Sequence, residues 1–468
     1  MLCLLASTVL KMSKPEQGVK SRKSRGRTAS LQTPEDLISY SKSEAKKKEI
    51  PIHVEQDSLL STASGFDNYR GILHLGAILL VLTTFRVALD NLIKYGVLVN
   101  PIMWFEIVVG DPDRWPCTVL ILTLNIYILG ALLVEKTVVK RAISEAVVFW
   151  VYFVILASVL VVPTATVVVV APNPVAAAFA LSLHTITFLK LFSYMVVNRD
   201  LRKQKKQGHD VGETQAKQDK DNIAIYPENS NVKDIYYFMF APTLCYELNF
   251  PRNKRIRRRY LLKRLGEVII FSSMLLALGQ QWLVPTIQNS MQPFKELNYS
   301  RAVERVLKLA VPNHFLWLMF FYVFFHSFLN LIGEVLRFAD RGFYSDWWNA
   351  ETIPEFWSEW NIPAHKWARR HVFKPMLHAG FSKLQAATVV FFISAFFHEF
   401  LVSVPLRMLR AWAFVGMISQ IPLAYATSRL LKGYLGNIVV WLSLILGQPI
   451  AVLMYFHDYY IIHSSPSS

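Results

Sequence analysis

The long apolar runs constrain the fold of this chain more than any other feature, because a run of about twenty residues is the length that crosses a bilayer. Hydrophobic residues make up 53% of the 468 positions. Within lipid only helices and closed barrels satisfy their backbone, and continuous apolar runs exclude alternating barrel strands. The sequence predicts an all-α, polytopic membrane protein. About nine transmembrane helices are expected, at about residues 71–93, 116–134, 146–168, 175–197, 262–287, 311–335, 384–405, 411–431 and 437–459.

Most of the positive charge lies between these runs. If the N-terminus is cytosolic, the loops after the second, fourth, sixth and eighth runs should be basic, and they are. The loop at 163–174 carries no charge, whereas the loop at 289–308 carries several basic residues and fits least well. The pattern favours a cytosolic N-terminus and a lumenal C-terminus. It also accounts for the net charge of +17 without nucleic-acid binding.

Segments outside the runs have the composition of flexible chain. Residues 1–65, rich in Ser, Lys and Arg, predict a disordered cytosolic N-terminal tail; contact with a neighbouring subunit or with anionic lipid headgroups is the alternative. Residues 66–462 form the membrane domain, with a flexible cytosolic loop at 200–232. Residues 463–468 form a short lumenal tail. The sequon that begins at Asn298 lies in a predicted lumenal loop.

The cysteines and the first residues carry little signal. Cys3, Cys117 and Cys245 are scattered, so their spacing indicates neither a disulfide framework nor a zinc site. The apolar start at residues 1–10 is short and lacks a basic region before it, so we expect no cleaved signal peptide.

Three histidines lie well inside predicted spans, away from water: His184, His326 and His398. An isolated intramembrane histidine is usually a packing residue or a helix-to-helix hydrogen bond, but Glu399 adjoins His398 and an ionisable pair is costly in lipid. Adjacent residues point about 100° apart on a helix, so we expect Glu399 not to orient the ring. Ser394, one turn earlier, shares its face. A zinc protease motif would need a second histidine where Val402 stands, and we expect no metal.

The segment at 343–374 precedes the His398 helix and is rich in tryptophan and basic residues. One interpretation is an amphipathic cytosolic-side helix in the headgroup layer, with its indole rings at the interface. The other is a platform for an amphiphile with an anionic head and an acyl tail, in which arginine and lysine hold the phosphates. Asn361 lies before Pro363, so turn chemistry explains it; alternatively its amide donates a hydrogen bond to a carbonyl oxygen that gains charge.

Two pairs of charges have helical spacing. Arg86 and Asp90 lie four residues apart, and Glu334 and Arg337 lie three apart. We interpret both as structural ion pairs.

Several motifs resemble a known family. They are Phe343 to Asn349, Phe240 to Arg252, Gln288 to Met291, Asn361 to Trp367, the intramembrane His398-Glu399 and Gly447 to Tyr455. Together they resemble the membrane-bound O-acyltransferase family, in the branch of sterol and diacylglycerol O-acyltransferases, and they are more similar to its diacylglycerol members. The resemblance covers roughly residues 60–462.

The resemblance implies helices around an internal reaction chamber in the endoplasmic reticulum membrane. It implies transfer of an acyl group from acyl-coenzyme A, a co-substrate rather than a cofactor, to diacylglycerol, giving triacylglycerol. It also implies a homodimer or homotetramer. By resemblance His398 is the catalytic base and Asn361 its partner. Acyl-coenzyme A binding is assigned to Phe343, Tyr344, Asp346, Trp347, Trp348, Asn349, Trp360 and His365, and the chamber lining to Ser394, Glu399, Met417 and Gln420.

The chemistry of the residues agrees with this assignment. An alcohol is a poor nucleophile, and a neutral imidazole is the usual base that activates it near pH 7. No serine elbow or cysteine adjoins His398, so we expect direct attack on the thioester, with Cys245 as the alternative nucleophile. Two other functions stay open: a sterol O-acyltransferase, and a lipid scramblase or transporter that uses the same cavity without chemistry.

Overall fold

A computed structural model describes residues 70–100, 115–140, 143–207, 226–289, 299–431 and 433–464. The predicted tail at 1–65 and Asn298 lie outside these ranges. The chain divides into two units, residues 1–75 and 76–468, and the elements below belong to the second, apart from the first turns of α3. In the described ranges the structure is helical, with an isolated β-bridge between Arg252 and Phe338. The predicted all-α class is confirmed.

Seven helices in the described ranges are long and apolar enough to cross a membrane. They are α3 (Arg70–Tyr95), α5 (Trp115–Val139), α6 (Glu145–Val170), α7 (Pro174–Lys206), the continuous helix formed by α12 (Tyr299–Phe321), η4 (Tyr322–Phe328) and α13 (Leu329–Val335), α17 (Lys383–Leu406) and α20 (Tyr434–Ser464). The chain is therefore a polytopic membrane protein.

The two remaining predicted spans are helical but interrupted. α9 (Arg258–Leu278) continues through the π-helical turn η3 (Gly279–Leu283) into α10 (Val284–Asn289). α18 (Trp412–Ile418) meets α19 (Gln420–Arg429) at Ser419. Neither segment is among the seven helices that are long and apolar enough to span, so the count of nine stays a prediction.

Short helices connect the long ones. They are α8 (Val232–Phe240), the 3₁₀ turn η5 (Trp347–Asn349), α14 (Ile353–Trp360), α15 (Ile362–Ala368), the π-helical turn η6 (Arg369–Phe373) and α16 (Lys374–His378). α14 is amphipathic, as the sequence predicts, since Ile353 and Phe356 are buried while Glu355 is exposed.

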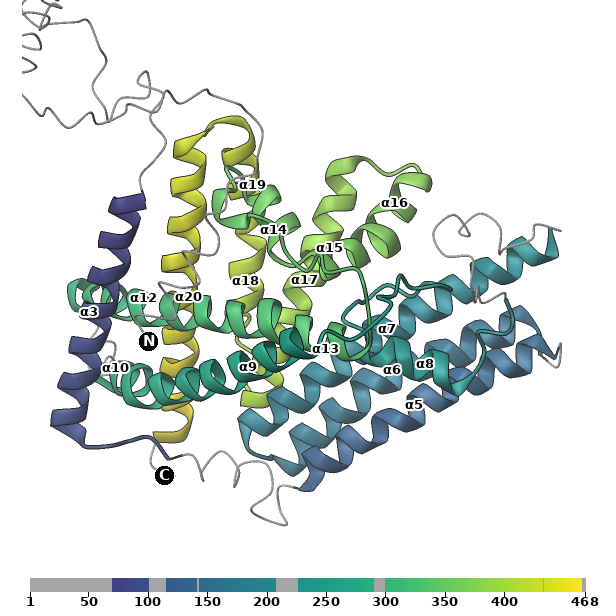
Figure 1. Cartoon of the computed structure of the whole chain (residues 1–468), viewed down its shortest axis with the longest axis horizontal. Helices are drawn as coiled ribbons and strands as arrows, with labels where there is room; N and C mark the ends of the chain where they lie inside the picture. The colour runs from purple at the N-terminus through teal and green to yellow at the C-terminus, as the bar shows by residue number, and fades with distance from the viewer. Residues whose placement is uncertain are drawn as a thin grey trace, which may run out of the picture. The chain divides into compact units, whose positions relative to one another are not determined.

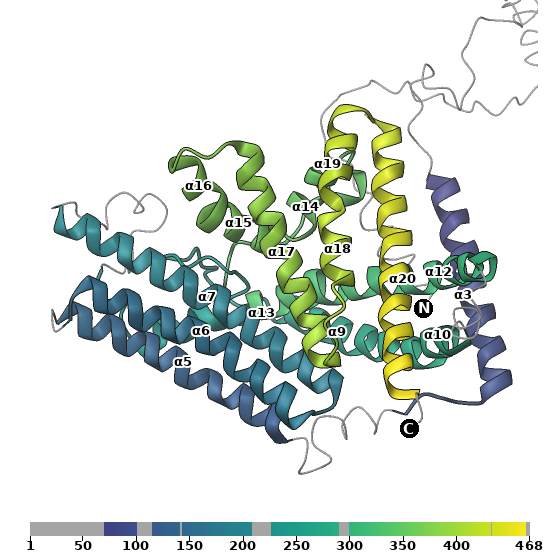
Figure 2. The same ribbon diagram turned by 180° about the vertical axis from the view of Figure 1, so that it is seen from behind.

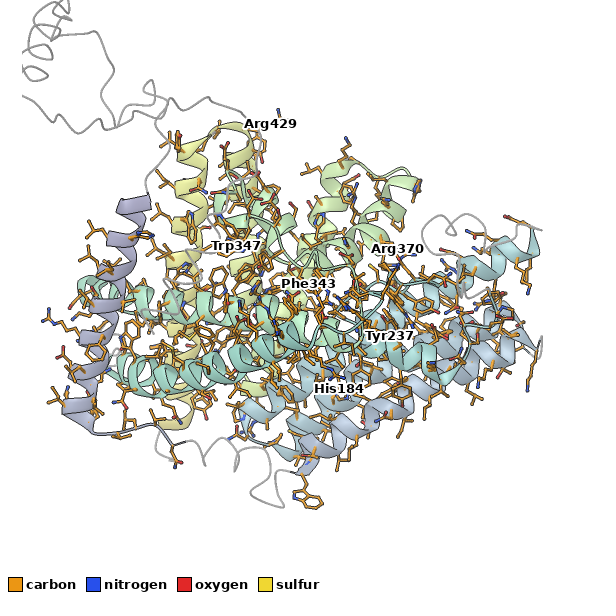
Figure 3. The ribbon with its side chains drawn as sticks, viewed as in Figure 1. His184, Tyr237, Phe343, Trp347, Arg370 and Arg429 are labelled. Carbon is orange, nitrogen blue, oxygen red and sulfur yellow. The ribbon has the colours of Figure 1, made fainter. Side chains whose placement is uncertain are left out.

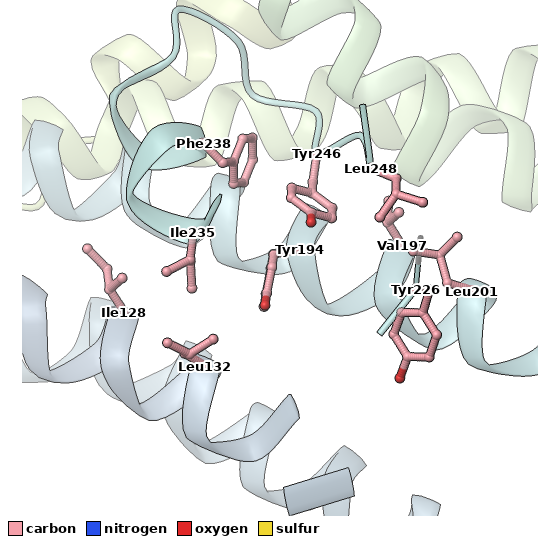
Figure 4. Packing of buried hydrophobic residues seen from close by; sticks show 10 residues of the cluster. All are labelled: Ile128, Leu132, Tyr194, Val197, Leu201, Tyr226, Ile235, Phe238, Tyr246 and Leu248. Carbon is pink, nitrogen blue, oxygen red and sulfur yellow. The ribbon is translucent and has the colours of Figure 1, made fainter. Parts of the chain in front are cut away.

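α5, α6 and α7 lie side by side (Figures 1 and 2), and α8 packs against α5 and α7. A buried cluster joins α5, α7 and α8 to the loop after α8 (Figure 4). At its centre the rings of Tyr194 and Tyr246 meet edge to face, with their centroids 4.9 Å apart. Edge-to-face pairs of this kind add to the free energy gained by burial.

Buried polar groups also join these helices. Glu135 of α5 and Arg202 of α7 form an ion pair and are 0% and 6% exposed. The hydroxyl of Tyr152, from α6, donates a hydrogen bond of 2.8 Å to the same carboxylate. Because a buried charge is stable only when it is paired, this network fixes the three helices in one register.

A buried lysine attaches α8 to the bundle. Lys190 of α7 donates hydrogen bonds to the carbonyl oxygens of Phe238, Met239 and Ala241, at 2.9, 2.8 and 2.7 Å. The last carbonyls of a helix have no partner within it, and a cation at this end is favourable. Lys190 therefore caps α8 from a neighbouring helix.

Two predicted loops differ from the structure. The predicted hairpin at 163–174 is shorter, since α6 continues through buried Pro163 to Val170 and α7 begins at Pro174, capped by Asn173. The predicted loop at 200–232 begins later, because α7 stays helical to Lys206. Within that loop, residues 208–225 lie outside the described ranges.

The predicted pairing of Glu334 with Arg337 is wrong. The Glu334 carboxylate is 1% exposed and instead binds Arg257 at 2.8 Å and Arg341 at 3.0 Å. Arg337 ends the helix with a positive φ of 54°, which turns its backbone away from the helical direction. Arg86 and Asp90 do approach, to 4.0 Å, and both side chains are exposed.

Candidate active site

Helix α17 carries His398. It begins after Ser382, whose hydroxyl accepts a hydrogen bond from the backbone N–H of Gln385, while the Gln385 side chain accepts one from the Ser382 N–H. This reciprocal capping box fixes where the helix starts. The helix packs against α7 and α18, and Figure 2 shows it between them.

The His398 ring has one defined tautomer. Its Nδ1 lies 2.8 Å from the carbonyl oxygen of Ser394, one turn earlier. A carbonyl oxygen only accepts hydrogen bonds, so Nδ1 carries the proton and Nε2 presents a lone pair. The Ser394 hydroxyl lies 3.5 Å from the same nitrogen, as the shared helical face predicts. His398 is therefore arranged as a proton acceptor through Nε2.

The same ring is accessible. His398 is exposed in the structure of the chain, although it lies in the middle of a spanning helix. The indole of Trp357, on α14, approaches the imidazole edge to face, with centroids 6.5 Å apart. Trp357 and α14 therefore border one side of the ring.

The other two intramembrane histidines are packing residues, as the alternative interpretation expected. His184 is 0% exposed, and its Nδ1 lies 2.9 Å from the Ala180 carbonyl oxygen. His326 contacts the Tyr344 hydroxyl at 2.7 Å. In the described ranges, no group of three metal-binding side chains could hold an ion.

Glu399 does not contact His398 but joins other elements. One carboxylate oxygen accepts hydrogen bonds from the Ser403 hydroxyl and, at 2.9 Å, from the Ala411 N–H. The other accepts from the Phe414 N–H at 3.0 Å and the Tyr455 hydroxyl at 2.7 Å. Glu399 thus connects α17 to the turn before α18 and to α20.

A cavity of 1040 Å³ borders this carboxylate. It lies between α6, α7 and α17, and hydrocarbon side chains such as Leu160, Val161 and Phe188 form most of its wall. Glu399, Ser403 and Thr164 supply the few polar groups. A space of this size and lining suits hydrocarbon chains.

Asn361 lies at the turn between α14 and α15. Its side-chain oxygen accepts a hydrogen bond of 3.2 Å from the Ala364 N–H and so caps α15. This is the turn role that the sequence offered as one alternative. No described contact joins Asn361 to His398, and a catalytic role for Asn361 stays a prediction.

The segment at 343–349 holds this turn in place. The Phe343 carbonyl oxygen accepts a hydrogen bond of 3.1 Å from the Ile362 N–H, and the Ser345 N–H donates one of 3.0 Å to the Glu359 carbonyl oxygen. Asp346 accepts hydrogen bonds from Ser345 and Asn349 within the segment. The segment is thus a backbone support for the α14–α15 turn.

Several aromatic residues of this region pack into the protein rather than facing outward. Phe343 and Trp347 are 2% and 3% exposed (Figure 3). Trp360 stacks on Trp317 of α12 with centroids 4.2 Å apart. The expectation of interfacial indole rings is therefore wrong for Trp347 and for Trp367, which is also buried. Trp347 packs against Trp317 of α12 and Trp441 of α20, whereas Trp367 packs against Phe192 of α7.

Three other residues that are predicted to bind acyl-coenzyme A differ from Phe343 and Trp347 in their exposure or their contacts. Trp348 is 44% exposed, and His365 of α15 is exposed. Tyr344 is held by His326. Contacts of these residues with acyl-coenzyme A stay a prediction.

Two of the residues that are predicted to line the chamber, Met417 and Gln420, lie on either side of the break between α18 and α19. Met417 is buried near the end of α18. Gln420 begins α19, and its Oε1 is buried without a hydrogen-bond partner in the described structure. A buried polar atom of this kind is costly unless a ligand or water completes it.

Sequence reasoning missed two polar residues nearby. Asn313 of α12 donates a hydrogen bond of 3.2 Å to the Gln448 side chain of α20. The sequence does mark both residues, because they are polar and lie inside predicted apolar spans. Trp357 was also missed as a site residue, although it precedes Asn361 by one helical turn.

Cys245, the alternative nucleophile, is unsuited to that role. Burial raises the pKa of its thiol to about 11, with Arg370 opposing the shift. The thiolate is the nucleophilic form, and little of it exists near pH 7 at such a pKa.

Comparison with known proteins adds independent information. A model of the membrane-bound O-acyltransferase family matches residues 143–457. The chain is 52% identical over 416 residues to diacylglycerol O-acyltransferase 1 of Homo sapiens, covering 89% of this chain and 85% of that protein. It is 51% identical to the Bos taurus protein of that name, covering 88% and 85%. It is 40% identical to diacylglycerol O-acyltransferase 1-2 of Oryza sativa, covering 87% and 86%.

Proposed function

This chain belongs to the membrane-bound O-acyltransferase family, and we propose that it transfers an acyl group from acyl-coenzyme A to diacylglycerol, giving triacylglycerol. The similarity to proteins named diacylglycerol O-acyltransferase supports this acceptor, over most of both chains. The observation that carries the chemistry is the accessible His398 ring with its protonated Nδ1 bound to Ser394.

The proposed reaction is direct. His398 Nε2 accepts the proton of the diacylglycerol hydroxyl as its oxygen bonds to the thioester carbon. The imidazolium keeps its Nδ1–H bond to the Ser394 carbonyl oxygen, which stabilises the new positive charge. The tetrahedral intermediate then breaks its carbon–sulfur bond, and the proton passes from His398 to the departing thiolate. Base and acid are thus the same residue, and no net proton is consumed.

The surroundings support this reaction. The apolar cavity beside Glu399 suits the hydrocarbon chains of a neutral lipid, which would arrive sideways from the bilayer. Asn361 is proposed to stabilise the oxyanion through its amide N–H, since its side-chain oxygen is already bound to the Ala364 N–H. The raised pKa of Cys245 supports direct attack over an acyl-enzyme. Full activity of Cys245→Ala is the expected result.

Location and assembly are also proposals. We place the protein in the endoplasmic reticulum membrane, as its family resemblance implies. The basic loops that follow the even-numbered predicted spans favour a cytosolic N-terminus and a lumenal C-terminus. Protease protection of tags at both ends tests this orientation. A homodimer or homotetramer is expected, and light scattering of the purified protein would give its mass.

One assay separates this function from its alternatives. Purified protein in micelles receives labelled oleoyl-coenzyme A with either diacylglycerol or cholesterol, and the lipid products are separated. Labelled triacylglycerol without steryl ester is the expected result. Steryl ester alone would indicate a sterol O-acyltransferase, and no labelled ester at all would favour a scramblase or transporter.

A further inference from the structure

A dense basic segment runs from the loop before α9 into its first turns and has no part in the proposed reaction. It carries Arg252, Lys254, Arg255, Arg257, Arg258, Arg259, Lys263 and Arg264, without an acidic residue between the first and the last. Only part of this charge is neutralised within the described structure.

About half of the cations have partners within the protein. Arg257 binds Glu334, and Arg264 binds Glu267 at 2.6 Å. Lys263 lies 3.8 Å from Glu267 as well. Arg252 lies over the ring of Tyr237, at 4.2 Å.

The other four cations are exposed, and no ion pair with another described residue is recorded for them. They are Lys254, Arg255, Arg258 and Arg259. Their positive charge is therefore available to an external anion.

The exposed surface continues from these cations into hydrocarbon side chains. Arg258, Leu262, Leu265 and Ile269 follow one another at intervals of four, three and four residues, so they share one face of α9. The three apolar residues are 66%, 42% and 58% exposed. A cation above a row of exposed apolar side chains matches an amphiphile with an anionic head and a hydrocarbon chain.

We propose that this face of α9 binds an anionic phospholipid of the surrounding leaflet. Lys254, Arg255, Arg258 and Arg259 hold its phosphate headgroup, and an acyl chain lies along Leu262, Leu265 and Ile269. Each cation close to the membrane surface attracts an anionic lipid headgroup. The site does not depend on the acceptor alcohol, and lipid binding is measurable without the acyl-transfer reaction.

The test compares two variants that remove equal charge. The first is Lys254→Gln/Arg255→Gln/Arg258→Gln/Arg259→Gln. The control replaces Lys136, Lys140, Arg199 and Lys203, which are exposed cations at the ends of α5 and α7. Each purified protein, in micelles, is titrated with fluorescent phosphatidylserine and with fluorescent phosphatidylcholine.

Wild type and control should bind phosphatidylserine on the order of tenfold more tightly than phosphatidylcholine, and the first variant should lose most of this preference. An unchanged preference in the first variant, or equal loss in the control, would overturn the proposal. So would a raised KM for oleoyl-coenzyme A with unchanged phosphatidylserine binding, which would assign the cations to the nucleotide.

A second test uses the wild-type protein alone, so it does not depend on whether the first variant folds. The preference for phosphatidylserine should fall several-fold as NaCl rises from about 50 to about 300 mM, because salt screens exposed charges. A salt-independent preference would also overturn the proposal.

Discussion

The Tyr455 hydroxyl donates a hydrogen bond of 2.7 Å to Glu399, the residue that follows His398 in α17. This bond joins α20 to the helix that carries the proposed base. We predict that Tyr455→Phe lowers the free energy of unfolding by about 1 kcal/mol and lowers activity several-fold, because α17 loses one of its anchors. Thermal unfolding and initial rates at saturating substrates measure the two effects. A variant with wild-type stability and rate would show that this anchor is dispensable.

Lys190 should be essential for the attachment of α8. Lys190→Met leaves three carbonyl oxygens at the end of α8 without donors, and we expect a loss of about 3 kcal/mol or more in the free energy of unfolding. Lys203→Met, at an exposed position of the same helix, is the control and should change it by less than about 0.5 kcal/mol. Equal unfolding temperatures for the two variants would contradict the capping role.

The sequence predicts local relationships better than distant ones. Ser394 and His398 lie one turn apart on a single helix, so their contact follows from helical geometry alone. Tyr455, which donates to Glu399, and the carbonyl oxygens that accept from Lys190 come from elements dozens of residues away, and no periodicity indicates them. Hydropathy likewise predicts where helices lie but not the π-helical turns, such as η3, that interrupt them.

The wrong predictions for Trp347 and Glu334 have the same cause, because each has a partner that also lies far away in the sequence. Trp347 sits in a polar, basic stretch that resembles an interfacial helix, yet it is buried because α12 and α20 supply aromatic partners. Glu334 has Arg337 at helical spacing, but the helix ends there and Arg257 and Arg341 bind the carboxylate instead. In both cases tertiary packing outweighs a local pattern.

Buried His371 should make stability depend on pH. Burial, with a smaller effect of Arg370, lowers the pKa of His371 from 6.5 to about 4. Between these values the unfolded chain binds a proton that the folded chain does not, so the free energy of unfolding should decrease as pH falls, by roughly 1–2 kcal/mol from pH 6.5 to 5. Wild type and His371→Gln are compared by thermal unfolding across this range. A variant with the same pH dependence as wild type would exclude His371 as the cause.

Asn361 offers a way to separate capping from catalysis. Asp caps a helix as well as Asn does, but an ionised carboxylate donates no hydrogen bond. If the Asn361 amide stabilises the oxyanion, Asn361→Asp should keep the unfolding temperature and lose about 100-fold in kcat. Asn361→Ala should lose both kcat and about 1 kcal/mol of stability. Normal turnover by a stable Asn361→Asp protein would leave Asn361 with its capping role alone.

The most direct test of the account is acyl transfer by His398→Ala. The purified variant, shown by gel filtration and thermal unfolding to be folded, is incubated with labelled oleoyl-coenzyme A and diacylglycerol. Loss of the proton acceptor should reduce labelled triacylglycerol by about 10²-fold or more, while binding of oleoyl-coenzyme A changes little. A folded variant that forms triacylglycerol at the wild-type rate would contradict the role of His398 as the base.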